Sequence, residues 1–348
     1  MSLVSLHNEW DPLEEMIVGI ADNARVPGAE PGLFAVDYAD MYDSPDQVPS
    51  GPYDARVIEE TAEDLQIFAD FLTANGVTVR RPVPTDHAAR FGTPDWTADG
   101  ESNYCPRDVL LTVGDKIIET PMVLRTRYFE PFAYKEMLLE YFASGANWIS
   151  APKPRLADGT YRLRPQDGQV LGELEPLFDA ANVLRAGRDL LYLVSASGNR
   201  LGAEWLQRVL GEEYTVHALE GVYGGTHIDT TISLIRPGLM VLNPTRVRPD
   251  DLPPPFKKWD FISCPPLPDN DPEAPWLRAT TWIGMNLVMV NPGLAVVDPS
   301  HGPLIAELER HGIDVAPLRL RHSRRLSGGF HCVSLDVRRS GILEDYGS

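Results

Sequence analysis

Three cysteines, Cys105, Cys264 and Cys332, are all that the chain of 348 residues contains. So few thiols in so long a chain do not make the disulfide framework of a small secreted protein. The sequence also lacks a Cys-x-x-Cys pair and a second cluster of residues with the spacing of metal ligands. We therefore expect neither a disulfide scaffold nor a bound metal.

Basic residues are scarce, because 31 Lys and Arg stand against 50 Asp and Glu, for a net charge of −19. This balance argues against nucleic acids and anionic membranes as partners, and it would attract a cationic substrate. No apolar run approaches the length that spans a bilayer. The chain begins with acidic residues where a secretion signal needs basic ones, so we expect a soluble, cytoplasmic protein.

What the chain does contain is a recurring pattern of short β-rich runs on either side of a glycine turn, which is typical of β-hairpins. Segments with an apolar stripe at helical spacing alternate with the hairpins. The expected hairpins cover residues 109–118, 183–193, 232–242 and 287–297, after strands at 15–18 and 77–79; the expected helices are Glu59–Asn75, Pro131–Phe142, Ala203–Leu210 and Pro303–Arg310.

Hairpin, helix and strand recur at intervals of roughly fifty to seventy residues, which indicates an internally repeated architecture. A closed ring of ββαβ units fits this pattern, because closure removes exposed sheet edges. We therefore predict an α+β fold and a single domain over residues 1–348. Residues 21–53 are expected to form a long surface excursion, and the proline-rich residues 249–276 a surface loop.

Polar residues stand just before the first strand of each unit. In a ring, such equivalent positions converge on one centre, which would then hold a thiol, an imidazole and several carboxylates. The residues in question are Asp108, Asp179, His227 with Asp229, Gly284 with Asn286, and Cys332.

Cys332 follows two glycines and opens a run in which apolar residues alternate, as in a strand. On such a strand its thiol lies on the face opposite Val333, which suits a nucleophile. A packing role is the alternative, since free cysteine is among the most buried residue types. His331 would point to the opposite face, so we assign it a structural role.

The other positions also have simpler explanations. Asp179 could be a turn or helix-cap residue. His227 and Asp229 could form half of a metal site. Asp108 could serve only to pair with a nearby arginine. Their equivalent places in one repeat favour a shared site instead.

Several motifs in the same order resemble the amidinotransferases, the family that includes arginine:glycine amidinotransferase and the inosamine-phosphate amidinotransferases of streptomycin-type aminoglycoside biosynthesis. The resemblance covers nearly the whole chain. It implies the pentein fold, a five-bladed αβ-propeller of ββαβ modules. The motifs are residues 8–15 (NEWDPLEE), 76–82 (GVTVRRP), 104–108 (YCPRD), 178–181 (FDAA), 185–189 (RAGRD), 227–229 (HID) and 328–332 (GGFHC).

The resemblance also implies the catalytic groups. Cys332 matches the family's nucleophile, His227 its general acid and base, and Asp179 the carboxylate that orients the histidine. The implied enzyme is a transferase of one-carbon groups that moves the amidino group of L-arginine onto an acceptor amine. It releases ornithine, works through an S-amidino-cysteine intermediate with ping-pong kinetics, and needs no cofactor.

The resemblance implies substrate contacts as well. Asp108 and Asp229 match the carboxylates that hold the guanidinium, and Arg246 matches the arginine that binds the donor's carboxylate. The sequence resembles the inosamine-phosphate enzymes most, so we expect an inosamine phosphate (scyllo-inosamine 4-phosphate type) as acceptor. Arg107, Arg125 and Arg127 are candidates for its phosphate, and we choose Arg127.

The chain departs from the glycine-using enzymes at three positions. Gly224 and Thr226 stand where those enzymes have Asn and Met, and Gly284 stands where they have Ser, two residues before Asn286. Smaller side chains would widen the pocket for a cyclitol, so we include Gly284 and Asn286 among the substrate-binding residues.

Four alternatives remain: an arginine:glycine amidinotransferase, a guanidino-hydrolase of the arginine deiminase type, a non-catalytic pentein that only binds a partner, and a metal-dependent enzyme. We expect small-molecule partners, no nucleic acid and no membrane, and a homodimer is compatible with the sequence. Either residues 21–53 or residues 323–327 could cover the site.

Overall fold

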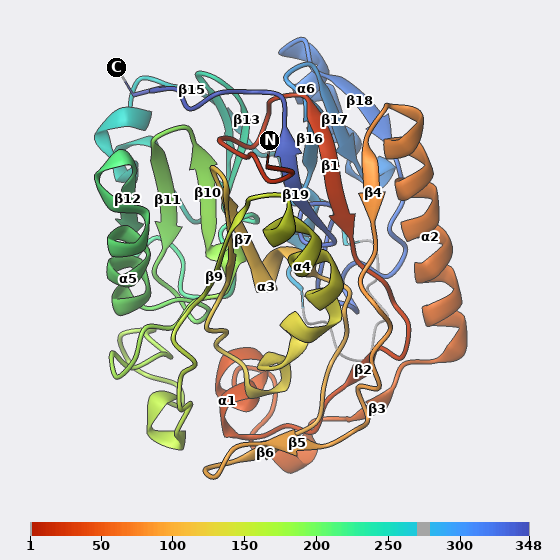
Figure 1. Ribbon diagram of the computed structural model, residues 1–348, viewed down its shortest axis with the longest axis vertical. Coiled ribbons are helices and arrows are strands. Elements are labelled where there is room, and N and C mark those ends of the chain that lie inside the picture. The colour runs from red at the N-terminus through yellow and green to blue at the C-terminus, as the bar shows by residue number, and fades with distance from the viewer. Residues whose placement is uncertain (1, 270–278, 348) are drawn as a thin grey trace.

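The computed structural model describes residues 2–269 and 279–347. Within them, the two strands of each predicted hairpin pair antiparallel, and a third strand returns parallel to the second. Together with the sheet formed by the chain's first and last strands, this gives five three-stranded sheets. Figure 1 shows the sheets set around a common centre. The predicted α+β fold of ββαβ units is confirmed.

The elements of the repeat follow in chain order. The first sheet contains β19 (Ser334–Arg339), β1 (Leu13–Val18) and β4 (Thr78–Arg80); the second contains β7 (Leu110–Val113), β8 (Lys116–Glu119) and β9 (Asn147–Ser150). The third contains β10 (Val183–Ala186), β11 (Asp189–Leu193) and β12 (Thr215–Leu219); the fourth contains β13 (Ile232–Arg236), β14 (Leu239–Leu242) and β15 (Asp260–Ser263); the fifth contains β16 (Val288–Asn291), β17 (Leu294–Val297) and β18 (Asp314–Pro317). Helices α2 (Ala55–Ala74), α4 (Lys135–Ala143), α5 (Arg200–Leu210) and α6 (Gly302–Arg310) lead into β4, β9, β12 and β18, and shorter elements are α1 (Pro31–Leu33), α3 (Pro106–Val109), β2 (Arg25–Val26), β3 (Gly51–Pro52), β5 (Phe91–Gly92) and β6 (Thr97–Ala98).

Buried apolar side chains join each sheet to the next. One cluster packs the first sheet against the second, another packs the second against the third, and a third cluster links the third, fourth and fifth. A further cluster joins the fifth sheet back to the first through Val296 and Met16. The ring is therefore closed by hydrophobic packing as well as by the pairing of β1 with β19, in which Ile17 lies opposite Leu335.

Helix starts differ from the prediction because side-chain caps decide them. α2 begins four residues before the predicted Glu59, since Asp54 accepts a hydrogen bond from the backbone of Arg56 (2.8 Å). α5 begins before the predicted Ala203, since Asn199 caps it in the same way. The first turn predicted for α4 is a 3₁₀ helix, Glu130–Tyr134.

Two segments predicted as surface loops are more ordered than expected. In residues 21–53, Leu33, Phe34 and Tyr38 are buried in an apolar cluster that they share with residues from 96–177, so this segment is a packed layer rather than an exposed excursion. Within residues 249–276, Asp260–Ser263 forms β15 and completes the fourth sheet. Residues 270–276 lie outside the part of the chain that the structure describes.

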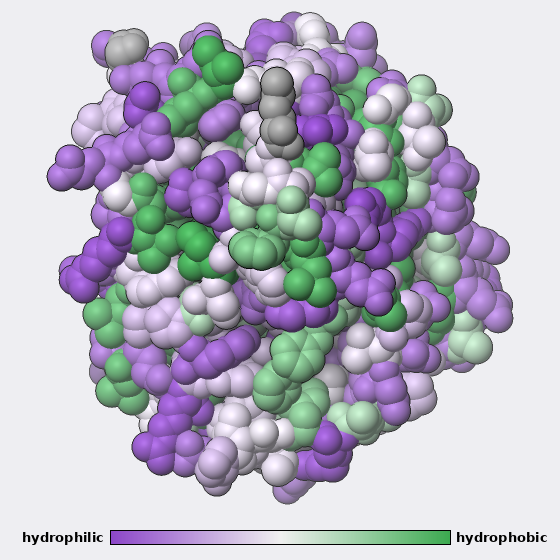
Figure 2. Space-filling view, in the orientation of Figure 1, coloured by the Kyte–Doolittle hydropathy of each residue, from purple (hydrophilic) through white to green (hydrophobic). Residues whose placement is uncertain are grey.

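The face of the molecule in Figure 2 is mostly hydrophilic, and its hydrophobic side chains lie in small separate groups. This surface agrees with the excess of acidic residues in the sequence. Among the described residues, no helix combines the length and the apolar character that crossing a bilayer would require.

One buried cation connects the second sheet to the first. Arg107, in α3, donates from Nε to the carbonyl oxygens of His331 (2.6 Å) and Ser334 (2.9 Å). Its guanidinium also pairs with Asp336 of β19, and both side chains are almost fully buried. Because these carbonyls lie on either side of Cys332, Arg107 fixes the backbone that carries the thiol.

We expect Arg107→Met to lower the free energy of unfolding by about 3–5 kcal/mol, because it removes the buried partner of two carbonyls and one of the two arginines that pair with Asp336. The matched control is Arg208→Met, which breaks an exposed ion pair with Glu204 and should cost less than about 1 kcal/mol. Urea unfolding measures both. Equal costs for the two variants would contradict the role given to Arg107.

Candidate active site

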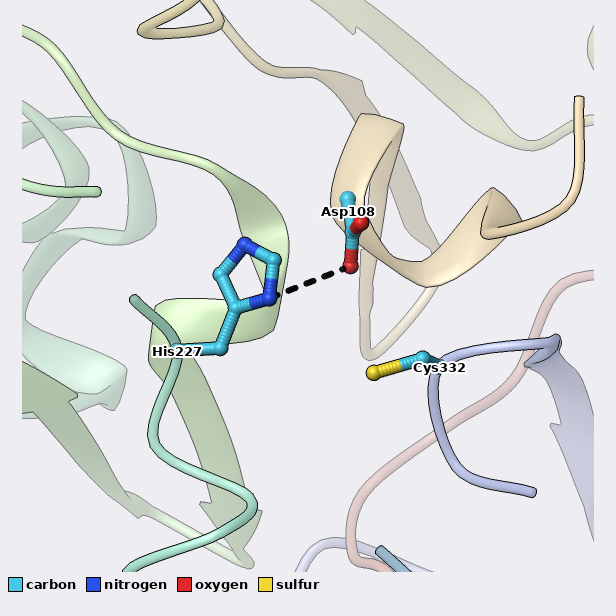
Figure 3. Close-up of side chains that lie close together, drawn as sticks. All are labelled: Asp108, His227 and Cys332. Carbon is cyan, nitrogen blue, oxygen red and sulfur yellow. Dashed lines mark ion pairs between the residues drawn. The ribbon is translucent and has the colours of Figure 1, made fainter. Parts of the chain in front are cut away.

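The predicted site residues lie where the repeat places them, ahead of the first strand of each sheet. Asp108 is in α3, before β7, and Asp179 directly precedes a 3₁₀ turn that leads into β10. His227 and Asp229 precede β13, and Cys332 lies in the turn before β19. Figure 3 shows the side chains of Asp108, His227 and Cys332 pointing toward one another from three separate elements.

Cys332 is held by Asn286 on two sides. The backbone N–H of Cys332 donates to Asn286 Oδ1 (2.9 Å), and Asn286 Nδ2 donates to the Cys332 sulfur (2.9 Å). The thiol donates in turn to Asp229 Oδ2 (3.2 Å). Asn286, predicted as a substrate contact, therefore positions the nucleophile candidate.

The turn that carries Cys332 needs its glycines for close packing. A Cβ on Gly328 would lie 2.6 Å from the sulfur of Cys105 and 3.1 Å from Cys332 Cβ. A Cβ on Gly329 would lie 2.7 Å from Asn286 Cβ. The predicted strand begins only at Ser334, because the N–H of Val333 bonds back to Gly329 and closes a turn around Cys332.

His227 lies between two carboxylates. Its Nε2 is 3.1 Å from Asp179 Oδ2, and its Nδ1 is 3.7 Å from Asp108 Oδ1 (dashed in Figure 3). Its backbone has φ = +62°, a left-handed conformation that costs energy for a residue other than glycine, and the Ser197 hydroxyl accepts its N–H (2.9 Å). Asp179 is itself fixed by the N–H of Val123 (3.1 Å).

Charge sets the protonation of His227. Burial lowers the pKa of its imidazole, but the charge of Asp108 and the hydrogen bonds to Asp179 and Cys332 outweigh burial and raise the pKa well above its ordinary value. The raised pKa favours the protonated imidazole, which can donate a proton to a leaving group.

The same surroundings keep the Cys332 thiol protonated. A hydrogen bond with the Cys105 thiol, burial and the charge of Asp229 raise the pKa of Cys332 well above its ordinary value, although the contact with His227 lowers it. Cys105 was not predicted as part of the site, although it lies in the quoted motif that contains Asp108. A thiol in this state becomes a nucleophile only when a positive charge arrives to offset the acids.

Two carboxylate oxygens of the site lack a hydrogen-bond donor within the part of the chain that the structure describes. Among the described residues, Asp108 Oδ1 and Asp229 Oδ1 are buried and accept no hydrogen bond. Burial raises the pKa of Asp108 against the influence of His227 and Arg127, whereas the contact with His331 lowers the pKa of Asp229 despite its burial. Unsatisfied buried carboxylate oxygens are costly unless a ligand pairs with them.

Arg246 has the surroundings of an anion-binding residue. Its guanidinium stacks on the Tyr223 ring at 3.6 Å from the centroid, and its N–H groups donate to oxygens of Thr230 (2.7 and 3.1 Å) and Thr231 (3.3 Å). No ion pair links it to a carboxylate within the described residues. The positive charge is therefore oriented by neutral groups and is available for a substrate carboxylate.

Two of the predicted acceptor contacts, Arg127 and Gly284, lie against other protein groups in the structure. Arg127 donates to Asp108 (2.5 Å) and forms two hydrogen bonds with Glu130 (2.6 and 3.0 Å), so buried carboxylates already occupy the guanidinium predicted to bind a phosphate. Gly284 does not widen the pocket, because a Cβ there would collide with the ring of His301. Arg125 is also paired, with Glu30 (2.9 Å).

A cavity of about 30 Å³ adjoins these groups, lined by Asp108, Asp179 and His227. Both segments predicted to cover the site contribute to its lining, residues 36–37 from one and residues 326–327 from the other. This space is near the size of one or two waters, so the pocket must open to admit a larger molecule.

Asp108, His227 and Cys332 place one ligand atom each within 4.8 Å of one another, a spacing at which a metal ion could also be held. The contacts of Asp108 with Arg127 and of the Cys332 sulfur with Asn286 favour covalent chemistry instead. We assign no metal to the site.

Five sheets of ββαβ units around a buried polar centre define the pentein fold. No family model matches the chain. The chain is 58% identical over 346 residues to inosamine-phosphate amidinotransferase 1 of Streptomyces glaucescens, covering 99% of each, and 37% identical to the mitochondrial glycine amidinotransferase of Danio rerio, covering 99% of this chain and 84% of that one. The solved inosamine-phosphate amidinotransferase of Streptomyces griseus superimposes with a TM-score of 0.98 at 56% identity, over all of both chains. The chain belongs to the amidinotransferase family.

We expect iodoacetamide to alkylate Cys332 slowly at neutral pH, with a rate that rises about tenfold per pH unit from pH 7 to 9, because only the thiolate reacts. Asp229→Asn removes a charge that raises the pKa of the thiol and should react faster than wild type throughout this range. Peptide mass spectrometry measures both. Cys264, whose pKa burial raises to about 12, is the internal reference; a plateau below pH 8 at Cys332 would contradict this account.

Proposed function

We propose that the protein transfers the amidino group of L-arginine to the amine of an inosamine phosphate and releases ornithine. The observation that carries the proposal is that one buried carboxylate oxygen of Asp108 and one of Asp229, beside the Cys332 thiol, accept no hydrogen bond from any described residue. A guanidinium is planar, cationic and rich in N–H donors, so it suits two such acceptors. Arg246 supplies the contact for the amino acid's carboxylate.

Binding of the donor activates the nucleophile. The guanidinium offsets the negative charge that keeps the Cys332 thiol protonated, and the thiol releases its proton to solvent as the donor binds. The thiolate then attacks the central guanidinium carbon, which Asp108 and Asp229 hold in place. In the free protein the thiol stays largely inert, so activation depends on the substrate.

His227 serves both halves of the reaction. As an imidazolium it gives its proton to the departing nitrogen of ornithine, and the C–N bond breaks to leave S-amidino-Cys332. The acceptor amine then attacks the same carbon, the neutral His227 takes its proton, and the C–S bond breaks to restore the thiolate. Asp179 keeps the imidazole aimed at the reacting atoms through both steps.

The close packing around the sulfur supports transfer rather than hydrolysis. Cys332 is 2% exposed, so water reaches the sulfur only while the pocket is open. The higher identity to the inosamine-phosphate enzymes than to the glycine enzyme supports an aminocyclitol phosphate as acceptor.

The test is to incubate the protein with guanidino-labelled L-arginine in the absence of acceptor and to measure its intact mass. We expect one labelled amidino group on Cys332, discharged by scyllo-inosamine phosphate and not by glycine. Cys332→Ala should carry no label, whereas the control Cys264→Ala, which changes a buried thiol in another cluster, should be labelled like wild type. Discharge by glycine would show that glycine, and not an inosamine phosphate, is the acceptor. Rapid loss of label to water would indicate a hydrolase. An unlabelled wild type would overturn the proposal.

A further inference from the structure

Cys332 belongs to a second series of buried, hydrogen-bonded side chains, which contains two carboxylates and an imidazole. The carboxylate that accepts the thiol, Asp229 Oδ2, also lies 3.0 Å from Nδ1 of His331. The other ring nitrogen, Nε2, lies 3.3 Å from Oε2 of Glu9. All four side chains are less than a tenth exposed. The sequence motifs contain Glu9 and His331, but the mechanism above uses neither.

Glu9, at the end of this series, is held in place by two arginines. Its Oε1 accepts from the side chain of Arg185 (2.7 Å) and from the Arg185 backbone (3.1 Å). Arg107 Nη1 lies 3.6 Å from Oε2, and Arg107 also binds the carbonyl of His331. Both ends of His331, its backbone and its imidazole, are therefore held in place.

The geometry dictates what His331 does to Asp229. Each ring nitrogen faces a carboxylate oxygen, and a carboxylate only accepts, so both nitrogens donate and the ring is a cation. The bond to Oδ2 leaves Asp229 Oδ1 as the unpartnered oxygen. Other charged or titratable groups acting on Asp229 are Cys332, His227, Arg107, Arg246 and Tyr223.

We propose that His331, anchored by Glu9, is a positioning residue that holds Asp229 as an anion and turns its free oxygen toward the donor guanidinium. The inference rests on the proposed function, because it concerns the site that receives arginine. It assigns the two histidines different tasks: His227 moves protons, and His331 keeps the charge of the binding carboxylate in place. His331 itself touches neither the donor nor the acceptor.

The sign of the pH effect follows from burial. Without the imidazolium, burial favours the protonated form of Asp229, so its pKa rises and the binding anion is lost at a higher pH than in wild type. For His331→Gln, which keeps an N–H donor without the charge, we expect the acid limb of the kcat/KM profile for arginine to move to higher pH, with a loss of about tenfold for each pH unit below the raised pKa of Asp229. As pH rises through the raised pKa, Asp229 ionises again and kcat/KM returns toward wild type.

The experiment compares pH profiles of kcat/KM for arginine in wild type, His331→Gln and His217→Gln. The last is the matched control, since His217 pairs with Asp189 (2.6 Å) in the third sheet. Glu9→Gln, which removes the anchor's charge, should shift the acid limb in the same direction by less, and it tests the proposal if His331→Gln does not fold.

An unchanged profile, or a loss by the same factor at every pH, would overturn the role of His331. A wild type that forms no amidino adduct would instead overturn the proposed function, so the two failures are distinguishable.

Discussion

The buried guanidinium of Arg107 is the contact on which the site depends most. It binds the carbonyls on either side of the Cys332 turn and a carboxylate of β19, and it is the immediate neighbour of Asp108 in α3. A buried ion pair adds little net stability, but removing one partner leaves an uncompensated charge. Arg107 therefore specifies geometry. It holds the turn that carries the Cys332 thiol against α3, which also carries Asp108.

Closure of the ring explains how distant segments form one centre. The last strand, β19, pairs with the first, β1, and Cys332 in the turn before β19 lies beside Asp108, His227 and Asp229. The resulting pocket holds more acids than cations, and it raises the pKa of both the thiol and the His227 imidazole. The negative charges that keep the free thiol protonated also favour a cationic substrate, and the charge of that substrate offsets them.

Sequence patterns predicted the architecture because the repeat is local. Alternating apolar runs with glycine turns specify hairpins. In a closed ring, the polar residues that precede the hairpins meet at one centre. Helix starts were predicted less well, since Asp54 and Asn199 act as caps outside the apolar stripe. The Cys332 strand was placed too early because a hydrogen bond from Val333 to Gly329 closes a turn that alternation does not reveal.

The contacts that the sequence analysis did not anticipate depend on packing within the fold. Glu130 lies only three residues after Arg127, but Asp108, 19 residues before Arg127, joins the pair in one buried cluster, and His301 fills the space beside Gly284. Cys105 entered the site only through its packing against Gly328. The link from His331 to Glu9 spans most of the chain.

The most direct measurement is a crystal structure of Cys332→Ala with L-arginine bound. The account predicts that the guanidinium donates to Asp108 and Asp229, with its central carbon facing residue 332 and the amino acid's carboxylate on Arg246. Arginine bound with its guanidinium elsewhere, or Asp108 and Asp229 left without a ligand in the complex, would contradict the claim that these acids form the donor site.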